Sequence, residues 1–142
     1  MPHIQFFFPK PVSILKDRKR LKSFLLDTAA KTRKIESLNI IFCDDEYLLA
    51  INRQFLNHDY YTDIVTFDLS ASRKAHIEAE LYISADRVKE NAASIGAPFY
   101  KELHRVIFHG LLHLLGHADK TKKDKENMRV LEDRLIRKYF AQ

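Results

Sequence analysis

Residues 98–116 read PFYKELHRVIFHGLLHLLG, and this stretch predicts the central helix of the fold. Pro98 suits the first turn of a helix, and Gly116 suits its end. Between them, apolar residues recur at intervals of three and four, which indicates one hydrophobic face turned toward a core. The residues expected to face inward are Leu103, Val106, Ile107, Gly110, Leu111 and Leu114.

The segments around this helix show alternating helix and strand patterns. We expect further helices over residues 17–34, 44–57, 85–95 and 123–140, and strands over 37–43, 64–69 and 77–84. This mixed order predicts an α+β or α/β sheet covered by helices. The polar stretch 70–76, SASRKAH, is expected to form a wide, mobile turn between two strands, of the kind that often meets ligands.

Length and composition restrict the class of protein. The 142 residues fit one domain over 1–142, and a hydrophobic share of 46% with only 3 glycines and 4 prolines excludes a disordered or low-complexity chain. The apolar stretches fall short of the roughly 20 residues that cross a bilayer, and the N-terminal segment does not resemble a secretory signal. We therefore expect a cytoplasmic protein that does not enter a membrane. The single cysteine, Cys43, lies in the apolar run LNIIFC, so we expect a buried, inert thiol with no disulfide partner.

The net charge of +5 and the pI of about 9.3 are compatible with a polyanionic partner such as nucleic acid. The positive residues gather in two clusters, within 16–22 and 120–125. Clusters of this kind are also typical of an ordinary solvated surface.

Residues 109–120, HGLLHLLGHADK, carry the chemistry that the sequence predicts. Histidines four residues apart on a helix lie on one face, one turn apart, as two ligands of one metal ion require. That spacing alone is weak evidence in a chain with 7 histidines. The frame continues as His109-x-x-x-His113-x-x-Gly116-x-x-Asp119, and the glycine lets the chain turn so that the carboxylate returns toward the ion. Two imidazoles and one carboxylate form a usual catalytic zinc set that leaves the fourth position open.

His117 is the competing third ligand, because it lies four residues beyond His113. On an unbroken helix, His109 and His117 would stand about 12 Å apart along the axis, too far for one ion. We therefore predict one zinc ion held by His109, His113 and Asp119, although the same set also accepts nickel, iron or manganese. The frame is similar to that of metzincin proteases, but Gly110 stands where zinc proteases carry an acid, which argues against peptidase chemistry.

These residues resemble the YbeY family of metal-dependent endoribonucleases, whose signature is close to His-Gly-x-Leu-His-Leu-x-Gly-Tyr-Asp-His. The matching positions are His109, Gly110, Leu112, His113, Leu114 and Gly116. Two upstream segments are also similar to the family, INRQFLNHDYYTDIVTFDL at 51–69 and ELYISADRV at 80–88. The likeness covers roughly residues 44–120 in the same order.

The resemblance implies a single α+β domain, a small mixed sheet packed against helices, with the metal at the end of the central helix in a cleft. It implies hydrolysis of single-stranded RNA, with metal-activated water as the nucleophile, in maturation of the 3′ end of 16S ribosomal RNA and in ribosome quality control. The implied partners are ribosomal RNA and the small ribosomal subunit. The sequence assigns no protein side chain as the general base.

The chain departs from the family pattern in two places. Ala118 and Asp119 replace the final Asp-His of the signature, so the third ligand becomes a carboxylate. Leu56 and His58 stand where the family tends to carry an arginine and a lysine near the metal. The candidates to replace that positive charge are Arg53, Lys74 and Arg87.

Two other functions remain open from the sequence. A metal-dependent hydrolase of another substrate would share the site but ignore RNA. A ribosome-binding or RNA-binding module without activity would carry a structural metal, and a closed site that includes both His117 and Asp119 would favour it.

Overall fold

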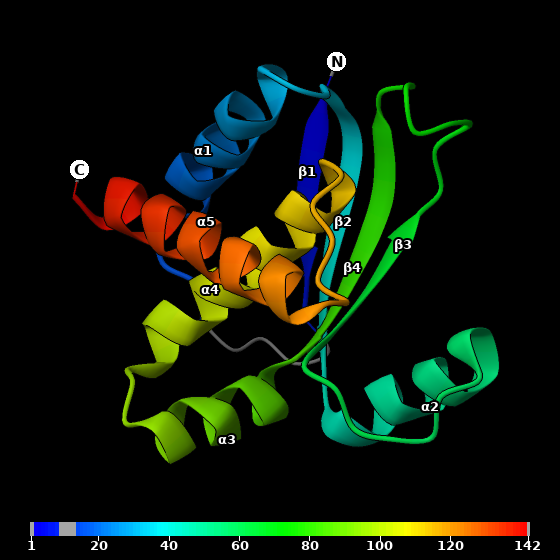
Figure 1. Cartoon of the computed structure of the whole chain (residues 1–142), viewed down its shortest axis with the longest axis vertical. Coiled ribbons are helices and arrows are strands. Elements are labelled where there is room, and N and C mark those ends of the chain that lie inside the picture. Colours follow the sequence, from blue (N-terminus) through cyan, green and yellow to red (C-terminus); the bar gives the residue numbers. More distant parts are fainter. Residues whose placement is uncertain (1, 9–13, 142) are drawn as a thin grey trace.

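A four-stranded sheet forms the centre of the structure, a computed structural model that describes residues 2–8 and 14–141 (Figure 1). Its strands are β1 (His3–Phe7), β2 (Ile35–Cys43), β3 (Ile64–Asp68) and β4 (Ile77–Ser84). They lie in the order β1-β2-β4-β3, with the first three of these parallel and β3 antiparallel to β4 at the edge. The sheet is therefore mixed, as the α+β prediction requires.

Five helices pack around this sheet. They are α1 (Arg18–Ala30), α2 (Asp45–Leu56), α3 (Ala85–Ile95), α4 (Phe99–Leu114) and α5 (Lys122–Phe140). Helices α1, α4 and α5 lie to one side of the sheet and α2 lies to the other (Figure 1). Helix α4 packs on β3 and β4 and carries α5 on its outer side, so the predicted central helix is confirmed.

Gly110 lets α4 approach the sheet closely. A Cβ atom at this position would lie 2.8 Å from Ile64 Cδ1 and 2.8 Å from Leu81 Cδ1, closer than side chains can pack. The glycine therefore has a packing role in addition to its place in the motif.

A smaller apolar cluster closes the opposite face of the sheet under α2. Cys43, Leu48, Ile51 and Val65 are buried there in mutual contact. Burial, with nearby aspartates adding to it, raises the pKa of the Cys43 thiol to about 12. The prediction of a buried, unreactive cysteine is confirmed.

Strand β1 is the element that the sequence patterns miss. Ile4 is buried and Phe6 packs against the main core, so the segment alternates as a strand does. Its hydrogen-bonding partner is β2, more than thirty residues away, in the register Ile4 to Leu38. Two nearby prolines and a run of three phenylalanines hide this short alternation.

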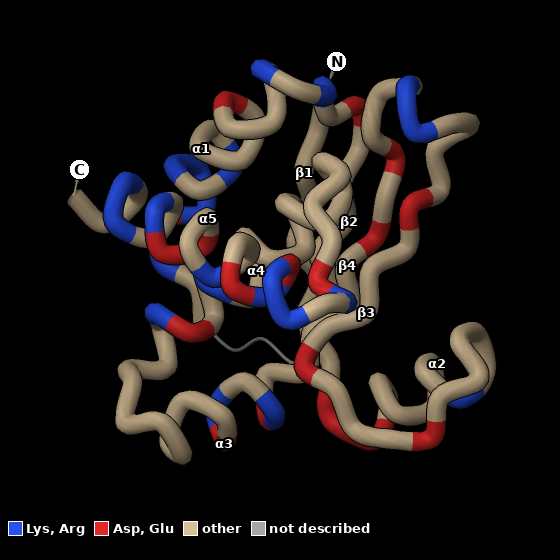
Figure 2. Tube along the Cα trace, viewed as in Figure 1, with Lys and Arg blue, Asp and Glu red and all other residues tan. Residues whose placement is uncertain are grey.

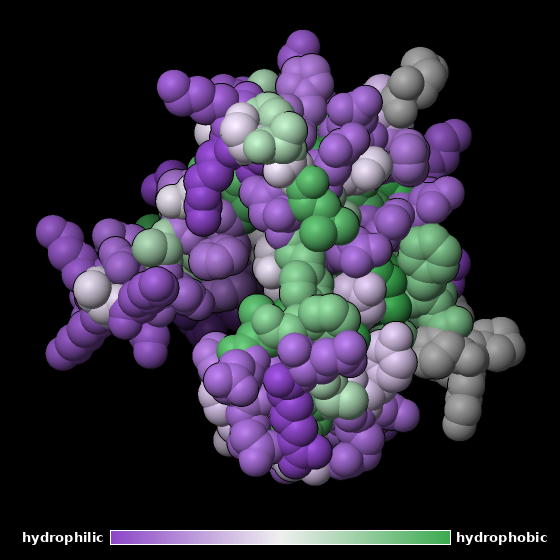
Figure 3. Space-filling view, turned by 90° about the vertical axis from the view of Figure 1, so that its right-hand side faces the viewer, coloured by the Kyte–Doolittle hydropathy of each residue, from purple (hydrophilic) through white to green (hydrophobic). Residues whose placement is uncertain are grey.

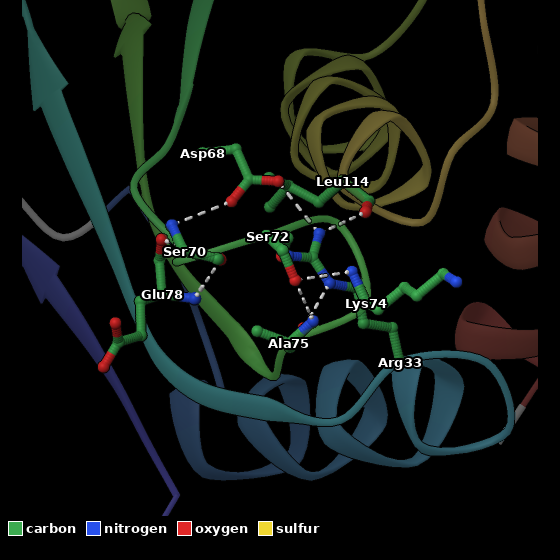
Figure 4. Close-up of polar contacts among 8 residues, drawn as sticks. All are labelled: Arg33, Asp68, Ser70, Ser72, Lys74, Ala75, Glu78 and Leu114. Carbon is green, nitrogen blue, oxygen red and sulfur yellow. Dashed lines mark hydrogen bonds and ion pairs between the residues drawn. The ribbon is translucent and has the colours of Figure 1, made fainter.

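The loop between β3 and β4 is exposed, but hydrogen bonds from Arg33 tie it to the body of the protein. The guanidinium of Arg33 donates to the backbone oxygens of Ala75 (2.7 Å) and Ser72 (3.0 Å) in this loop and to Asp68 (2.9 Å) at its start. It also donates to the backbone oxygen of Leu114 at the end of α4 (3.0 Å) (Figure 4). The predicted turn between two strands is confirmed, and its mobility stays a prediction.

Across the described ranges 2–8 and 14–141, no helix is both long enough and apolar enough to cross a membrane.

Candidate metal centre

Helix α4 and the turn that follows it bring two of the three predicted ligands together. His109 stands four residues before His113 on this helix. Gly116, with φ of +102°, takes a left-handed conformation that reverses the chain, and the His117 N–H returns to the Leu112 oxygen at 3.1 Å. The chain then runs back so that Asp119 Oδ2 lies 3.2 Å from His109 Nε2. The turn predicted from the glycine is confirmed.

His109, His113 and Asp119 line one cleft of about 440 Å³. Its other walls come from the end of α2, from the segment 58–66 that leads into β3, and from Lys120. Figure 3 shows the face that carries α2 and β3, with a column of hydrophobic side chains down its middle and a hollow beside it.

The three residues differ in how closely they meet. In the described ranges, no three His, Cys, Asp or Glu side chains are near enough together to enclose an ion as they stand. His109 and Asp119 form the close pair. His113 faces the same cleft, with its Nδ1 at 3.2 Å from the backbone oxygen of His117. The side chain of His117 is exposed and does not line the cleft.

A buried glutamate on α5 orients His109. Glu132 is 5% exposed, and its Oε2 accepts from His109 Nδ1 at 2.7 Å. Its other oxygen accepts from Arg105 at 3.3 Å, and Arg105 also pairs with Asp133 at 2.7 Å. Such a carboxylate fixes the tautomer of a ligating histidine and raises its basicity. The hydrogen bond that His109 donates to Glu132 raises the pKa of His109 despite burial, and Asp119 and Asp63 act in the same direction.

Glu132 is not among the residues predicted from the sequence, although a signal was present. It lies on the buried stripe of α5, four residues after Met128 and four before Ile136. A carboxylate at a core position of a helix is rarely fully buried unless it has a partner. Leu131 and Leu135, which flank this stripe, are only half-buried.

His109 and Asp119 are spaced as two ligands of one metal ion would be. Glu132 engages Nδ1 of His109, so Nε2 is the nitrogen that faces the cleft. Two ligand atoms held about 2.0–2.1 Å from a tetrahedral ion lie about 3.3 Å apart. The observed distance between His109 Nε2 and Asp119 Oδ2, 3.2 Å, is close to this value. The donor set of imidazole and carboxylate is one that zinc accepts.

A second cavity of about 430 Å³ meets the cleft at His109 and Asp119. Asp63, Arg105 and Arg129 are among its lining residues. Burial raises the pKa of Asp63, while the nearby His109 acts in the opposite direction. A desolvated carboxylate at such a junction is typical of functional sites.

Comparison with known proteins places the chain in a family. The family model described as Endoribonuclease YbeY matches residues 11–140. The chain belongs to the YbeY family. The endoribonuclease YbeY of Cytophaga hutchinsonii is 52% identical over 131 residues, which are 90% of each chain. That of Porphyromonas gingivalis is 40% identical over 132 residues, 92% of this chain and 86% of the relative.

A solved structure agrees with this assignment. The solution structure of TM1509 from Thermotoga maritima matches with a TM-score of 0.69 at 25% identity, over 98% of this chain and 90% of that one. The predicted resemblance to the YbeY family and the predicted fold are thereby confirmed. Membership of a YbeY endoribonuclease family also confirms the prediction of a hydrolase with an endoribonuclease role.

Three of the positions at which this YbeY chain departs from the expected signature, Leu56, His58 and Asp119, lie at the cleft. Leu56 and His58 both line it. His58 stacks on Tyr60 with 5.1 Å between ring centroids, and the Tyr60 hydroxyl lies 2.9 Å from His58 Nδ1. Asn52, which is buried, donates to the Tyr60 backbone oxygen at 3.0 Å and holds this wall in place.

The arginines expected to replace the missing charge are engaged elsewhere. Arg53 pairs with Asp59, and Arg87 pairs with Asp45 at 2.7 Å. Neither lines the cleft, whose lysine is Lys120.

Proposed function

We propose that this YbeY-family chain hydrolyses phosphodiester bonds of single-stranded RNA in the cleft, with one zinc ion held by His109, His113 and Asp119. The observation that carries the proposal is the position of these three side chains on the walls of one cleft, with His109 oriented by the buried Glu132. When bound, such an ion supplies Lewis-acid chemistry: it polarises a phosphoryl oxygen and makes water a better nucleophile.

The side chains around the ligands have separate tasks in this proposal. Glu132 keeps the proton of His109 on Nδ1, so that Nε2 stays free to ligate. Arg105 holds Glu132 in turn and balances its charge. Lys120 adds a positive charge to the cleft and attracts a phosphate.

The wall formed by His58 and Tyr60 favours a single strand over a duplex. Aromatic rings stack well on bases that are splayed out of a helix, and duplex RNA keeps its bases stacked inside. Both rings line the cleft that holds the ligands. We extend the proposal to ribosomal RNA, including the 3′ end of 16S RNA, to the small ribosomal subunit as partner, and to the cytoplasm as the site of action.

The test is cleavage of an end-labelled single-stranded ribosomal RNA fragment and of the same fragment annealed to its complement. We expect zinc-loaded protein to cut the single strand and to leave the duplex intact. His113→Ala and Asp119→Ala should cut at least about 100-fold more slowly, because each removes a ligand. His117→Ala is the matched control and should cut at the wild-type rate.

The result that overturns the proposal is equal cutting by wild type and Asp119→Ala. Cleavage of a peptide in place of RNA would favour the hydrolase of another substrate, and metal binding without any cleavage would favour the non-catalytic module. The exposed position of His117, away from the cleft lining, speaks against a closed four-ligand site.

A further inference from the structure

A third cavity, of about 520 Å³, lies at the other side of the α4 terminus. Three segments surround it: the turn between α1 and β2, the loop between β3 and β4, and residues 114–116. The charged side chains that line it are all positive, namely Arg33, Lys34, Arg73 and Lys74, with His76 beside them. No aspartate or glutamate is among its lining residues.

Three of these cations are available to a ligand. Lys34, Arg73 and Lys74 are exposed, and none forms an ion pair with a carboxylate in the described part of the chain. Figure 2 shows the positive segments of the α1–β2 turn and of the β3–β4 loop at the same end of the molecule. Like charges held around one cavity repel each other, so an anion there lowers the electrostatic energy.

Arg33 prepares the cavity instead of serving as its ligand. Its guanidinium already donates hydrogen bonds to Asp68 and to the backbone oxygens of Ala75, Ser72 and Leu114 (Figure 4). These bonds hold the loop that carries Arg73 and Lys74 against the end of α4, so less order is lost when a ligand binds. The bond to Leu114 also offsets the negative end of the α4 dipole, which would otherwise disfavour an anion.

The cavity and the cleft share one helix end. His113 lines the cleft, and the next residue, Leu114, lines the cavity. Single-stranded nucleic acids commonly occupy grooves of about 4–16 nucleotides, with cations following the backbone. A strand bound in the cleft therefore needs to continue only a short way around the end of α4 to reach Lys34, Arg73 and Lys74.

We propose that the cavity between the α1–β2 turn and the β3–β4 loop binds backbone phosphates of the RNA strand that leaves the cleft. The proposal rests on the proposed function, because it takes the same RNA as substrate. If so, the cavity strengthens the binding of long RNA strands and does not affect strands that are too short to reach it.

The test measures binding by fluorescence anisotropy, with EDTA present so that RNA is not cut. The ligands are a 20-nucleotide and a 4-nucleotide labelled single-stranded RNA. The triple variant Lys34→Gln, Arg73→Gln, Lys74→Gln removes the three free cations. The matched control Lys123→Gln, Lys125→Gln, Arg134→Gln removes the same charges from exposed positions of α5 that line neither the cleft nor this cavity. Circular dichroism and thermal unfolding check that both variants fold.

We expect the cavity variant to bind the 20-mer at least about tenfold more weakly at 0.1 M salt. The slope of log K against log salt should also become smaller by about two, because each of the three lost phosphate contacts contributes about 0.7. The control should stay within about twofold, and both variants should bind the 4-mer within about twofold of wild type. Equal weakening by the two triple variants, or an unchanged Kd of the cavity variant for the 20-mer, would overturn the proposal. Failure of the wild type to bind any RNA, together with no cleavage in the zinc-loaded assay, would instead overturn the proposed function and this inference with it. Normal RNA binding by a wild-type protein that cuts no RNA when loaded with zinc would refute only the catalytic proposal.

Discussion

Replacing Arg33 by methionine tests the account of the fold around the end of α4. The substitution keeps an aliphatic stem of similar length and removes the guanidinium, which makes four hydrogen bonds of 2.7–3.0 Å. The bonds to Ala75 and Ser72 lie near exposed loop positions, so water can replace them at small cost. Asp68 and the buried oxygen of Leu114 lose a charged donor, at about 1–3 kcal/mol each. Release of the buried Arg33 charge offsets part of this, and we expect a net loss of about 2–4 kcal/mol in the free energy of unfolding.

Urea unfolding at pH 7 measures this loss. With a slope of about 2 kcal/mol per M, the midpoint of Arg33→Met should fall by about 1–2 M. Arg73→Met, in the same loop but exposed, is the matched control and should stay within about 0.5 kcal/mol of wild type. A shift of Arg33→Met as small as that of the control would show that the Arg33 hydrogen bonds do not stabilise the fold.

The same variant should change how stability depends on pH. Burial of Asp68 raises its pKa, but hydrogen bonds from Arg33 and Ser70 outweigh this and leave the pKa lowered. A lowered pKa in the folded state stabilises the protein above the unfolded value of about 3.9, and this contribution disappears as the pH falls through the folded value. The difference between wild type and Arg33→Met should therefore be largest near neutral pH and shrink below about pH 4, as unfolding curves across pH 2.5–7 would record.

Three further predictions concern single positions. Gly110→Val should lower the free energy of unfolding by about 2 kcal/mol, because its side chain would press on Ile64, and a calorimetric midpoint equal to or above that of wild type would refute this. Glu132→Gln should weaken zinc binding about 10–100-fold, as competition with a chelating dye measures, since the amide no longer supports His109 as a carboxylate does; equal affinities would show that the Glu132 contact is irrelevant to the metal. Cys43, with a pKa of about 12, should react with a chromogenic disulfide at pH 8 only after denaturant is added, and rapid reaction of the native protein would contradict its burial.

The local elements of the fold were predictable from sequence because their signals are local. Asp17 and Asp44 cap α1 and α2, as their positions before apolar stripes indicate. Asn57 ends α2 with φ of 55°, in agreement with the predicted end of this helix. Strand β1 was not predicted, because the strand that stabilises it, β2, lies far along the chain and its own pattern spans only five residues.

The site was predictable as far as its residues are spaced along one helix and one turn. His109, His113 and Asp119 follow from such spacing, and the structure places them on one cleft. Glu132 and Arg33 did not follow, because their roles depend on contacts 23 to 81 residues away along the chain. A buried charge is recognised from sequence only when its partner is also known.

Metal content is the most direct test of whether His109, His113 and Asp119 hold a zinc ion. The wild-type protein and the variants His113→Ala, Asp119→Ala and His117→Ala are purified, loaded with zinc, desalted and analysed by inductively coupled plasma mass spectrometry. The account predicts one zinc per chain in wild type and His117→Ala, and loss of that zinc in His113→Ala and Asp119→Ala. Zinc retained in full by Asp119→Ala, or lost with His117→Ala instead, would contradict the assignment of the three ligands.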